Sequence, residues 1–109
     1  MRFLVTLVSV VALNQGTPAS PEPVHVDVKT FQFAPDTLRV SVGTIVRWTN
    51  QDEIEHRVSA GSPSKRDAAF NATLAKKGAT AERTFDRTGT FTYFCDRHQF
   101  MRGTITVTR

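Results

Sequence analysis

The sequence has one cysteine, one tyrosine, one tryptophan and two methionines among its 109 residues. A single cysteine excludes a disulfide within the chain, so Cys95 is a buried inert thiol, a link to another chain or a metal ligand. The formal net charge is +4, and the basic residues are scattered without aromatic partners, which gives no indication of nucleic-acid binding. Such a surface suits encounter with an acidic protein, or simply keeps the chain in solution.

No apolar run is long enough to cross a bilayer, and the longest lies at the N-terminus. Arg2 supplies a positive charge, and residues 3–13 form a run typical of a signal peptide, with a buried strand or an uncleaved anchor as the alternatives. We expect a signal peptide over residues 1–20, with a cleavage point that the sequence leaves open, and one domain over residues 21–109. The domain is then periplasmic or secreted, with no membrane span after cleavage.

The rest of the chain shows alternating apolar and polar residues, broken by turn residues at short intervals. This period of two predicts strands over residues 24–29, 31–33, 38–42, 45–50, 56–60, 80–85, 90–94 and 103–108. A bulge or bend is expected near Thr30, and a short hairpin connection at residues 43–44. The pattern is weakest over residues 65–78, where residues 67–75 favour a short helical turn. We therefore expect an all-β fold, a Greek-key antiparallel β-sandwich or barrel of seven to eight strands.

Three unusual residues follow one another at a spacing of three between the last two predicted strands. Cys95, His98 and Met101 form a C-x-x-H-x-x-M cluster, whose members singly suit a buried thiol, a loop histidine and a core methionine. Together they favour a loop curled around one ion, with His56 as a fourth ligand and His25 as the alternative. One thiolate, two imidazoles and a thioether are the ligands of a copper electron-transfer site.

The residues around this cluster resemble those of the cupredoxins, the small blue copper proteins. Residues 31–38, FQFAPDTL, are similar to the family pattern F-x-F-x-P-x-x-L, and residues 42–52, VGTIVRWTNQD, to V-G-x-x-V-x-W-x-N-x-D. Residues 93–103 resemble the ligand loop with two residues in each gap, which looks most like amicyanin, since plastocyanin and pseudoazurin have a longer gap between histidine and methionine. The resemblance implies one copper ion held by His56, Cys95, His98 and Met101.

Two positions differ from the family pattern, in which an asparagine follows the first histidine and a serine or threonine follows the cysteine. Arg57 and Asp96 stand there instead. We hypothesise that they form a charged pair that joins the His56 strand to the Cys95 strand, the alternative being that both face water. Near the ligand loop, Phe100 is either a docking residue, with Arg97 and Arg102 at its rim, or a packing residue over Met101.

These observations predict an extracytoplasmic, monomeric carrier of single electrons that uses one Cu(I)/Cu(II) ion and protein redox partners, some with acidic surfaces. The alternative is a copper-binding or delivery protein in metal homeostasis, without a dedicated redox partner. Catalysis is not expected, because four protein ligands leave no open position for a substrate.

Overall fold

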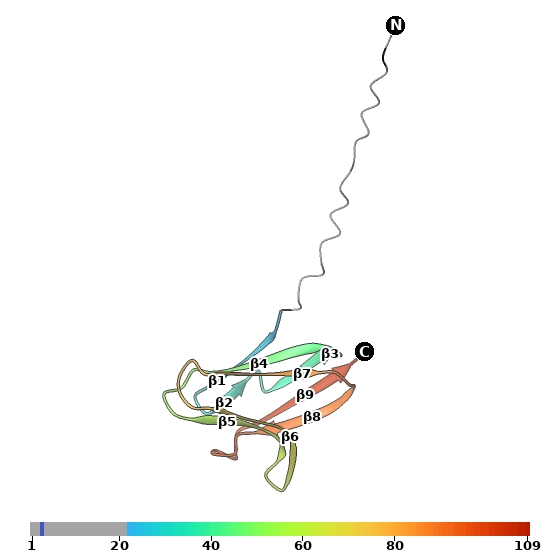
Figure 1. Cartoon of the computed structure of the whole chain (residues 1–109). Coiled ribbons are helices and arrows are strands. Elements are labelled where there is room, and N and C mark those ends of the chain that lie inside the picture. Colours follow the sequence, from blue (N-terminus) through green and yellow to red (C-terminus); the bar gives the residue numbers. More distant parts are fainter. Residues whose placement is uncertain (1–2, 4–21) are drawn as a thin grey trace.

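The computed structural model describes residue 3 and residues 22–109, and the latter form two β-sheets packed face to face (Figure 1). The strands are β1 (Val24–Lys29), β2 (Gln32–Ala34), β3 (Thr37–Ser41), β4 (Thr44–Asn50), β5 (His56–Ser62), β6 (Lys65–Leu74), β7 (Thr80–Phe85), β8 (Gly89–Phe94) and β9 (Arg102–Thr108). Within this part of the chain, no helix is long and apolar enough to cross a membrane. Apart from residue 3, the predicted signal peptide lies outside the described residues and stays a prediction.

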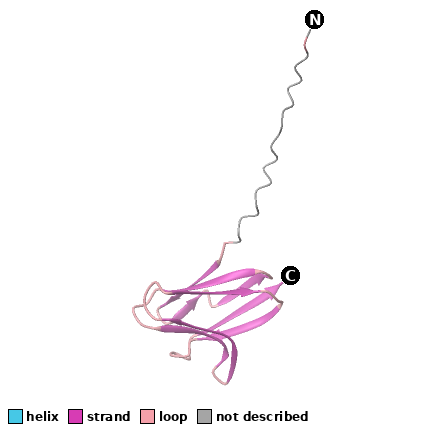
Figure 2. Ribbon diagram, in the orientation of Figure 1, coloured by secondary structure: helices cyan, strands magenta, loops and turns pink. Residues whose placement is uncertain are grey.

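The strands are arranged as β2-β1-β4-β7 in one sheet and β3-β9-β8-β5-β6 in the other. Figure 2 shows only strands and loops over the described residues. The all-β sandwich predicted from the sequence is therefore confirmed, with nine strands rather than seven or eight. Most neighbours are antiparallel, but β1 pairs with β4 and β3 pairs with β9 in parallel.

The sequence predicted a hairpin connection at residues 43–44, and this prediction was wrong. Strand β3 pairs with β9, whereas β4 pairs with β1 and β7 in the other sheet, so this turn carries the chain across the sandwich. Gly43 makes the turn with a φ of 93°, which a residue without a side chain adopts readily. Alternation predicts that a segment has one buried face, but it does not say in which sheet the segment lies.

The helical turn expected over residues 67–75 was wrong, because this segment belongs to β6, which pairs with β5 along an antiparallel hairpin. Strand β6 is an edge strand and most of its side chains are exposed, so it has little apolar alternation. The hairpin register shifts between Ser59 and Gly61. At Gly61, with a φ of 91°, a Cβ atom would lie 2.3 Å from the Lys65 carbonyl oxygen, so only glycine fits.

Inward-facing side chains of both sheets form one core, as the alternation predicted. Its largest fully buried apolar side chains are Trp48, Leu74, Met101, Ile105, Val26, Val28, Val46 and Val58, whereas the buried Phe94 lies outside this core cluster. Tyr93 packs against this group with its ring edge toward Trp48, the centroids 5.3 Å apart. The Tyr93 hydroxyl and the Trp48 indole nitrogen find no hydrogen-bond partner among the described residues. The core therefore buries a phenol that is costly to ionise.

We expect the folded protein to lose stability as the pH rises from 10 to 12. Burial raises the pKa of Tyr93 to about 12, against a weaker opposite effect of Trp48, while the unfolded phenol ionises at its ordinary value of 10. The unfolded state therefore releases a proton that the folded state keeps, which costs the fold about 2 kcal/mol by pH 12.

Tyr93 is the only tyrosine, so phenolate absorbance reports on it alone. The midpoint should lie near 12 in the folded chain and near 10 in denaturant. Tyr93→Phe should remove this part of the pH dependence of unfolding. A folded-state midpoint near 10 would contradict the burial argument.

Candidate metal centre

The predicted ligands come from two segments that meet at one end of the sandwich. His56 begins β5, whereas Cys95, His98 and Met101 lie in the loop that joins β8 to β9 and at its end. Strands β5 and β8 are antiparallel neighbours, with Ser59 opposite Phe94. The start of β5 therefore lies beside the end of β8, which places His56 next to Cys95.

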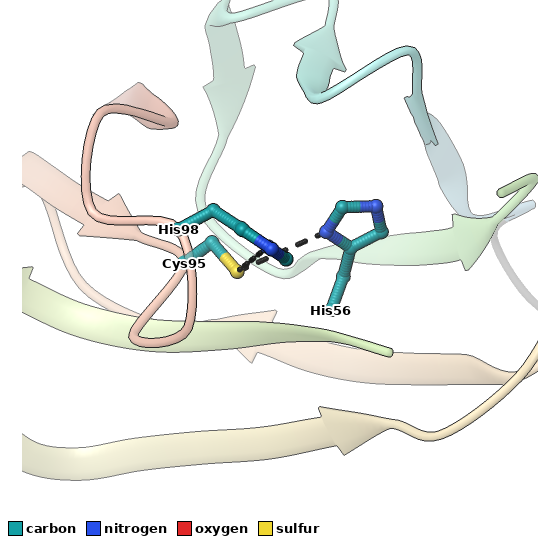
Figure 3. Close-up of side chains that lie close together, drawn as sticks. All are labelled: His56, Cys95 and His98. Carbon is teal, nitrogen blue, oxygen red and sulfur yellow. Dashed lines mark hydrogen bonds between the residues drawn. The ribbon is translucent and has the colours of Figure 1, made fainter. Parts of the chain in front are cut away.

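The two imidazoles turn toward the thiol, as Figure 3 shows. The Cys95 Sγ atom lies 3.9 Å from His56 Nδ1 and 3.9 Å from His98 Nδ1. One potential ligand atom from each of the three residues lies within 4.8 Å of the others. His56 and Cys95 are fully buried and His98 is half-buried. Met101 is buried in the same core cluster as Cys95, whereas His25 is exposed on β1 and takes no part.

Backbone hydrogen bonds fold the ligand loop on itself. The Cys95 N–H donates to the Met101 carbonyl at 3.2 Å, the His98 N–H to the Cys95 carbonyl at 3.2 Å, and the Met101 N–H to the His98 carbonyl at 2.9 Å. These bonds link each ligand residue to the next across the two-residue gaps of the motif. The loop is therefore ordered by its own backbone, and its ligands are positioned by the fold.

The thiol also accepts a backbone hydrogen bond from β5. The Arg57 N–H points at Cys95 Sγ, with the nitrogen 3.3 Å from the sulfur. A donor aimed at sulfur favours the thiolate, which is the form that binds metals. Sequence reasoning missed this contact, because a backbone donor carries no residue signature.

The spacing of the ligand atoms matches one ion. Bonds from a first-row metal ion such as zinc are about 2.3 Å to thiolate sulfur and about 2.0–2.1 Å to imidazole nitrogen, which in a trigonal plane sets sulfur and nitrogen about 3.8 Å apart. Both observed separations are 3.9 Å. The residues thus fit copper in the trigonal His₂Cys arrangement, with the Met101 thioether nearby as the soft fourth ligand.

The outward nitrogen of His56 is held by an acidic residue. Asp52 Oδ2 lies 2.7 Å from His56 Nε2. The Asp52 carboxylate also accepts the N–H groups of Thr30, at 2.9 Å, and Phe31, at 3.3 Å. Partial burial acts to raise the pKa of Asp52, but the three hydrogen bonds outweigh it and hold the pKa below its usual value. Sequence analysis included Asp52 only as the last residue of the family pattern over residues 42–52 and assigned it no role.

Two aromatic side chains, Phe31 and Phe100, lie beside the half-buried His98 and form an apolar collar. The Phe31 ring stands edge-on to His98 and His56, with centroid distances of 5.1 Å and 5.6 Å, and Phe100 lies 6.4 Å from His98. Phe100 is 69% exposed, so most of its surface is not packed against other side chains, and its docking role stays a prediction. Burial lowers the pKa of His98, and the charges of His56 and Arg97 lower it further.

The predicted Arg57–Asp96 pair is present as one contact in a longer chain of ion pairs. Asp96 lies 3.8 Å from Arg57 but 2.6 Å from Arg66 of β6, and Glu55 joins Arg57 to Arg97. The sequence did not identify Arg66, because the alternation is weakest over residues 65–78 and predicted no strand there. Arg102, the other predicted rim residue, donates to the Gln99 carbonyl at 2.7 Å and so braces the loop.

Comparisons with known proteins agree with this site. A model of copper-binding proteins of the plastocyanin/azurin family matches residues 22–108. The amicyanin of Paracoccus denitrificans is 33% identical over 82 residues, which are 75% of this chain and 63% of that protein. The plastocyanin of Scenedesmus fuscus is 30% identical over 89 residues, covering 74% of this chain and 91% of that protein. This chain thus spans less than two thirds of the Paracoccus amicyanin.

Solved structures extend the likeness to the fold. A reduced Trp-to-Tyr mutant of amicyanin superposes with a TM-score of 0.71 at 30% identity, over 79% of this chain and 82% of that one. A purple cupredoxin from Nitrosopumilus maritimus gives 0.71 at 26% identity, over 78% and 99%. Together with the converging ligand atoms of His56, Cys95 and His98, these matches show that the chain belongs to the plastocyanin/azurin family of copper-binding proteins, the cupredoxins.

Proposed function

We propose that this protein carries single electrons between protein partners outside the cytoplasm, through one ion that alternates between Cu(I) and Cu(II). The observation that carries the proposal is a buried ligand set that the fold assembles by itself, in which His56 and Cys95 are fully buried and His98 is half-buried. The family supports a copper protein without catalytic activity. The predicted signal peptide supports the compartment.

The roles of the ligands follow from their chemistry. Cys95 would hold copper as thiolate, His56 and His98 would hold it through Nδ1, and Met101 would add a weak thioether ligand. Soft sulfur suits Cu(I), whereas imidazole suits copper in both oxidation states. Because the loop bonds and the Arg57 N–H fix these side chains in advance, the protein has little to rearrange when an electron passes.

The collar is where a redox partner would dock. Phe31 and Phe100 offer apolar contact beside the His98 ring, while Arg97 lies on the same loop as His98 and Phe100, and Arg102 begins β9 directly after that loop. Arg97 is paired with Glu55, which leaves a polar rim of mixed charge. A net charge of +4 favours encounter with an acidic partner.

Electron self-exchange between copies tests this function without a known partner. Mixed Cu(I) and Cu(II) protein should exchange electrons fast enough to broaden ring-proton NMR signals near the site. Phe100→Ser should slow the exchange while the visible spectrum stays unchanged, because it alters the collar and not the ligands. Arg39→Ser, in β3, serves as a control away from the collar.

Slow exchange combined with rapid loss of copper to a chelator would instead support the second function, copper delivery. The half-exposed His98 gives that alternative its only structural support, since a ligand at the surface is where an acceptor would compete for the ion.

Asp96 should tune the copper site through its charge. It follows the thiolate ligand and pairs with Arg66 and Arg57, which hold its pKa below the usual range. Asp96→Asn removes a negative charge near the site, so we expect a higher reduction potential and little change in the unfolding midpoint, because the pairs are exposed to solvent. Cyclic voltammetry measures the shift. An unchanged reduction potential together with an unchanged copper affinity would show that the charge of Asp96 does not affect the copper site.

A further inference from the structure

Asp52 makes a contact that the ligand set does not explain. Only one nitrogen of His56, Nδ1, faces the Cys95 sulfur, and the other, Nε2, lies 2.7 Å from the Asp52 carboxylate. The His56 side chain is fully buried, so this carboxylate replaces water at its outer nitrogen.

The hydrogen bonds around Asp52 determine which nitrogen of His56 carries the proton. An ionised carboxylate only accepts hydrogen bonds, and the backbone N–H groups of Thr30 and Phe31 already donate to this one. His56 Nε2 must therefore be the donor. In the neutral imidazole, Nδ1 then keeps its lone pair on the side of Cys95, where a metal ion would bind.

We propose that Asp52 is a positioning residue of the copper site, whose carboxylate fixes His56 as the Nε2–H tautomer and strengthens Nδ1 as a ligand. Negative charge at the far nitrogen makes the imidazole a better electron donor. A stronger donor stabilises Cu(II) more than Cu(I), so Asp52 lowers the reduction potential. The inference rests on the copper site described above, and it does not depend on the partner or on the direction of electron flow.

The same carboxylate joins the collar to the ligand. Thr30 and Phe31 form the two-residue turn between β1 and β2, and both have positive φ values, 55° and 58°, which side chains disfavour. Their N–H groups converge on Asp52, and the Phe31 ring stands over both histidine rings. Asp52 thus holds a strained turn in the position where Phe31 covers the site.

Three variants separate this role from a general effect of charge. Asp52→Asn keeps an oxygen that can accept from His56 Nε2 but removes the charge, and Asp52→Ala removes both. Glu53→Gln is the matched control, because Glu53 is the adjacent carboxylate, is 84% exposed and pairs only with Lys77, at 3.6 Å, among the described residues. Thermal unfolding of each metal-free variant shows whether it is folded.

The first measurement uses the metal-free chain, and therefore does not depend on copper binding. Nitrogen-15 NMR of the His56 ring should show the Nε2–H tautomer in the parent chain, in Asp52→Asn and in Glu53→Gln. In Asp52→Ala the two tautomers should mix. A parent chain protonated at Nδ1 would overturn the proposal, as would a pure Nε2–H tautomer in folded Asp52→Ala.

The second measurement is the reduction potential of the copper-loaded variants. Asp52→Asn should shift the Cu(II)/Cu(I) affinity ratio at least tenfold toward Cu(I), which raises the potential by about 59 mV or more. Glu53→Gln should shift it by less than half as much. An unchanged potential in Asp52→Asn, or an equal shift in Glu53→Gln, would overturn the electronic role. If the parent chain failed to bind copper, the proposed function would fall while the NMR result still decided the role of Asp52.

Discussion

Cys95→Ser is expected to abolish the intense visible band of the copper-loaded protein and to weaken copper binding by more than about 100-fold, beyond the 10–100-fold typical of residues that only support a ligand. The band arises from thiolate bonded to Cu(II), and Cys95 is the only cysteine in the chain. A serine hydroxyl can still accept the Arg57 N–H that now points at sulfur. The substitution therefore changes the ligand and leaves its surroundings in place. Titration with Cu(II), followed by visible absorption, measures both effects.

Met101→Leu is the matched control for Cys95→Ser. It removes the other sulfur from the same loop at nearly constant volume, a swap that cores usually tolerate. Because an axial thioether is a weak, distant ligand, the visible band should persist and the reduction potential should change. Retention of the band in Cys95→Ser would contradict the role assigned to the Cys95 sulfur. Complete loss of the band in folded Met101→Leu would contradict the role assigned to the Met101 sulfur.

Gly103→Ala should destabilise the metal-free fold by about 3 kcal/mol, the upper end of the usual cost of overpacking. Gly103 lies opposite Tyr93 in the β8–β9 pair, and an added Cβ would lie 2.1 Å from the ring carbon Cζ. The ring has no room to move, because Phe33 and Trp48 pack against it with centroid distances of 4.7 Å and 5.3 Å. Urea denaturation without copper measures the effect, since a bound ion would add its own stabilisation.

A double-mutant cycle separates the clash from backbone effects. In an unobstructed strand, alanine is favoured over glycine by roughly 0.5–1 kcal/mol. Combined with Tyr93→Leu, which removes the ring, Gly103→Ala should therefore cost little or even stabilise the chain. If the penalty stayed near 3 kcal/mol in the Tyr93→Leu background, contact with the ring would not be its cause.

The sequence predicted the sandwich because most strands have one buried face, as in β1, where Val26 and Val28 are buried and their neighbours exposed. It could not predict β6, whose exposed edge position removes the alternation. It also could not assign β3 and β4 to different sheets, because pairing depends on contacts between residues far apart in the chain.

The ligand set was predictable for a chemical reason, since thiolate, imidazole and thioether rarely occur together at such spacing by chance. The surroundings of the ligands were not predictable from the sequence. Phe31 reaches the site because the two-residue turn after β1 brings it to His56, whereas Asp52 lies in the loop between β4 and β5, four residues before that ligand. The Arg57 N–H reaches sulfur through strand pairing, which no residue type encodes. The sequence thus identified the residues that bind the ion, whereas the fold showed which neighbouring groups hold those residues in position.

X-ray absorption at the copper edge of the loaded protein tests the central claim, that one ion is held by the side chains that converge at the end of β5 and β8. The account predicts a single short copper–sulfur distance and two imidazole nitrogens, with nearly the same distances in Cu(I) and Cu(II) protein. A coordination sphere of oxygen and nitrogen without sulfur, or one that changes its ligands between the two oxidation states, would contradict it.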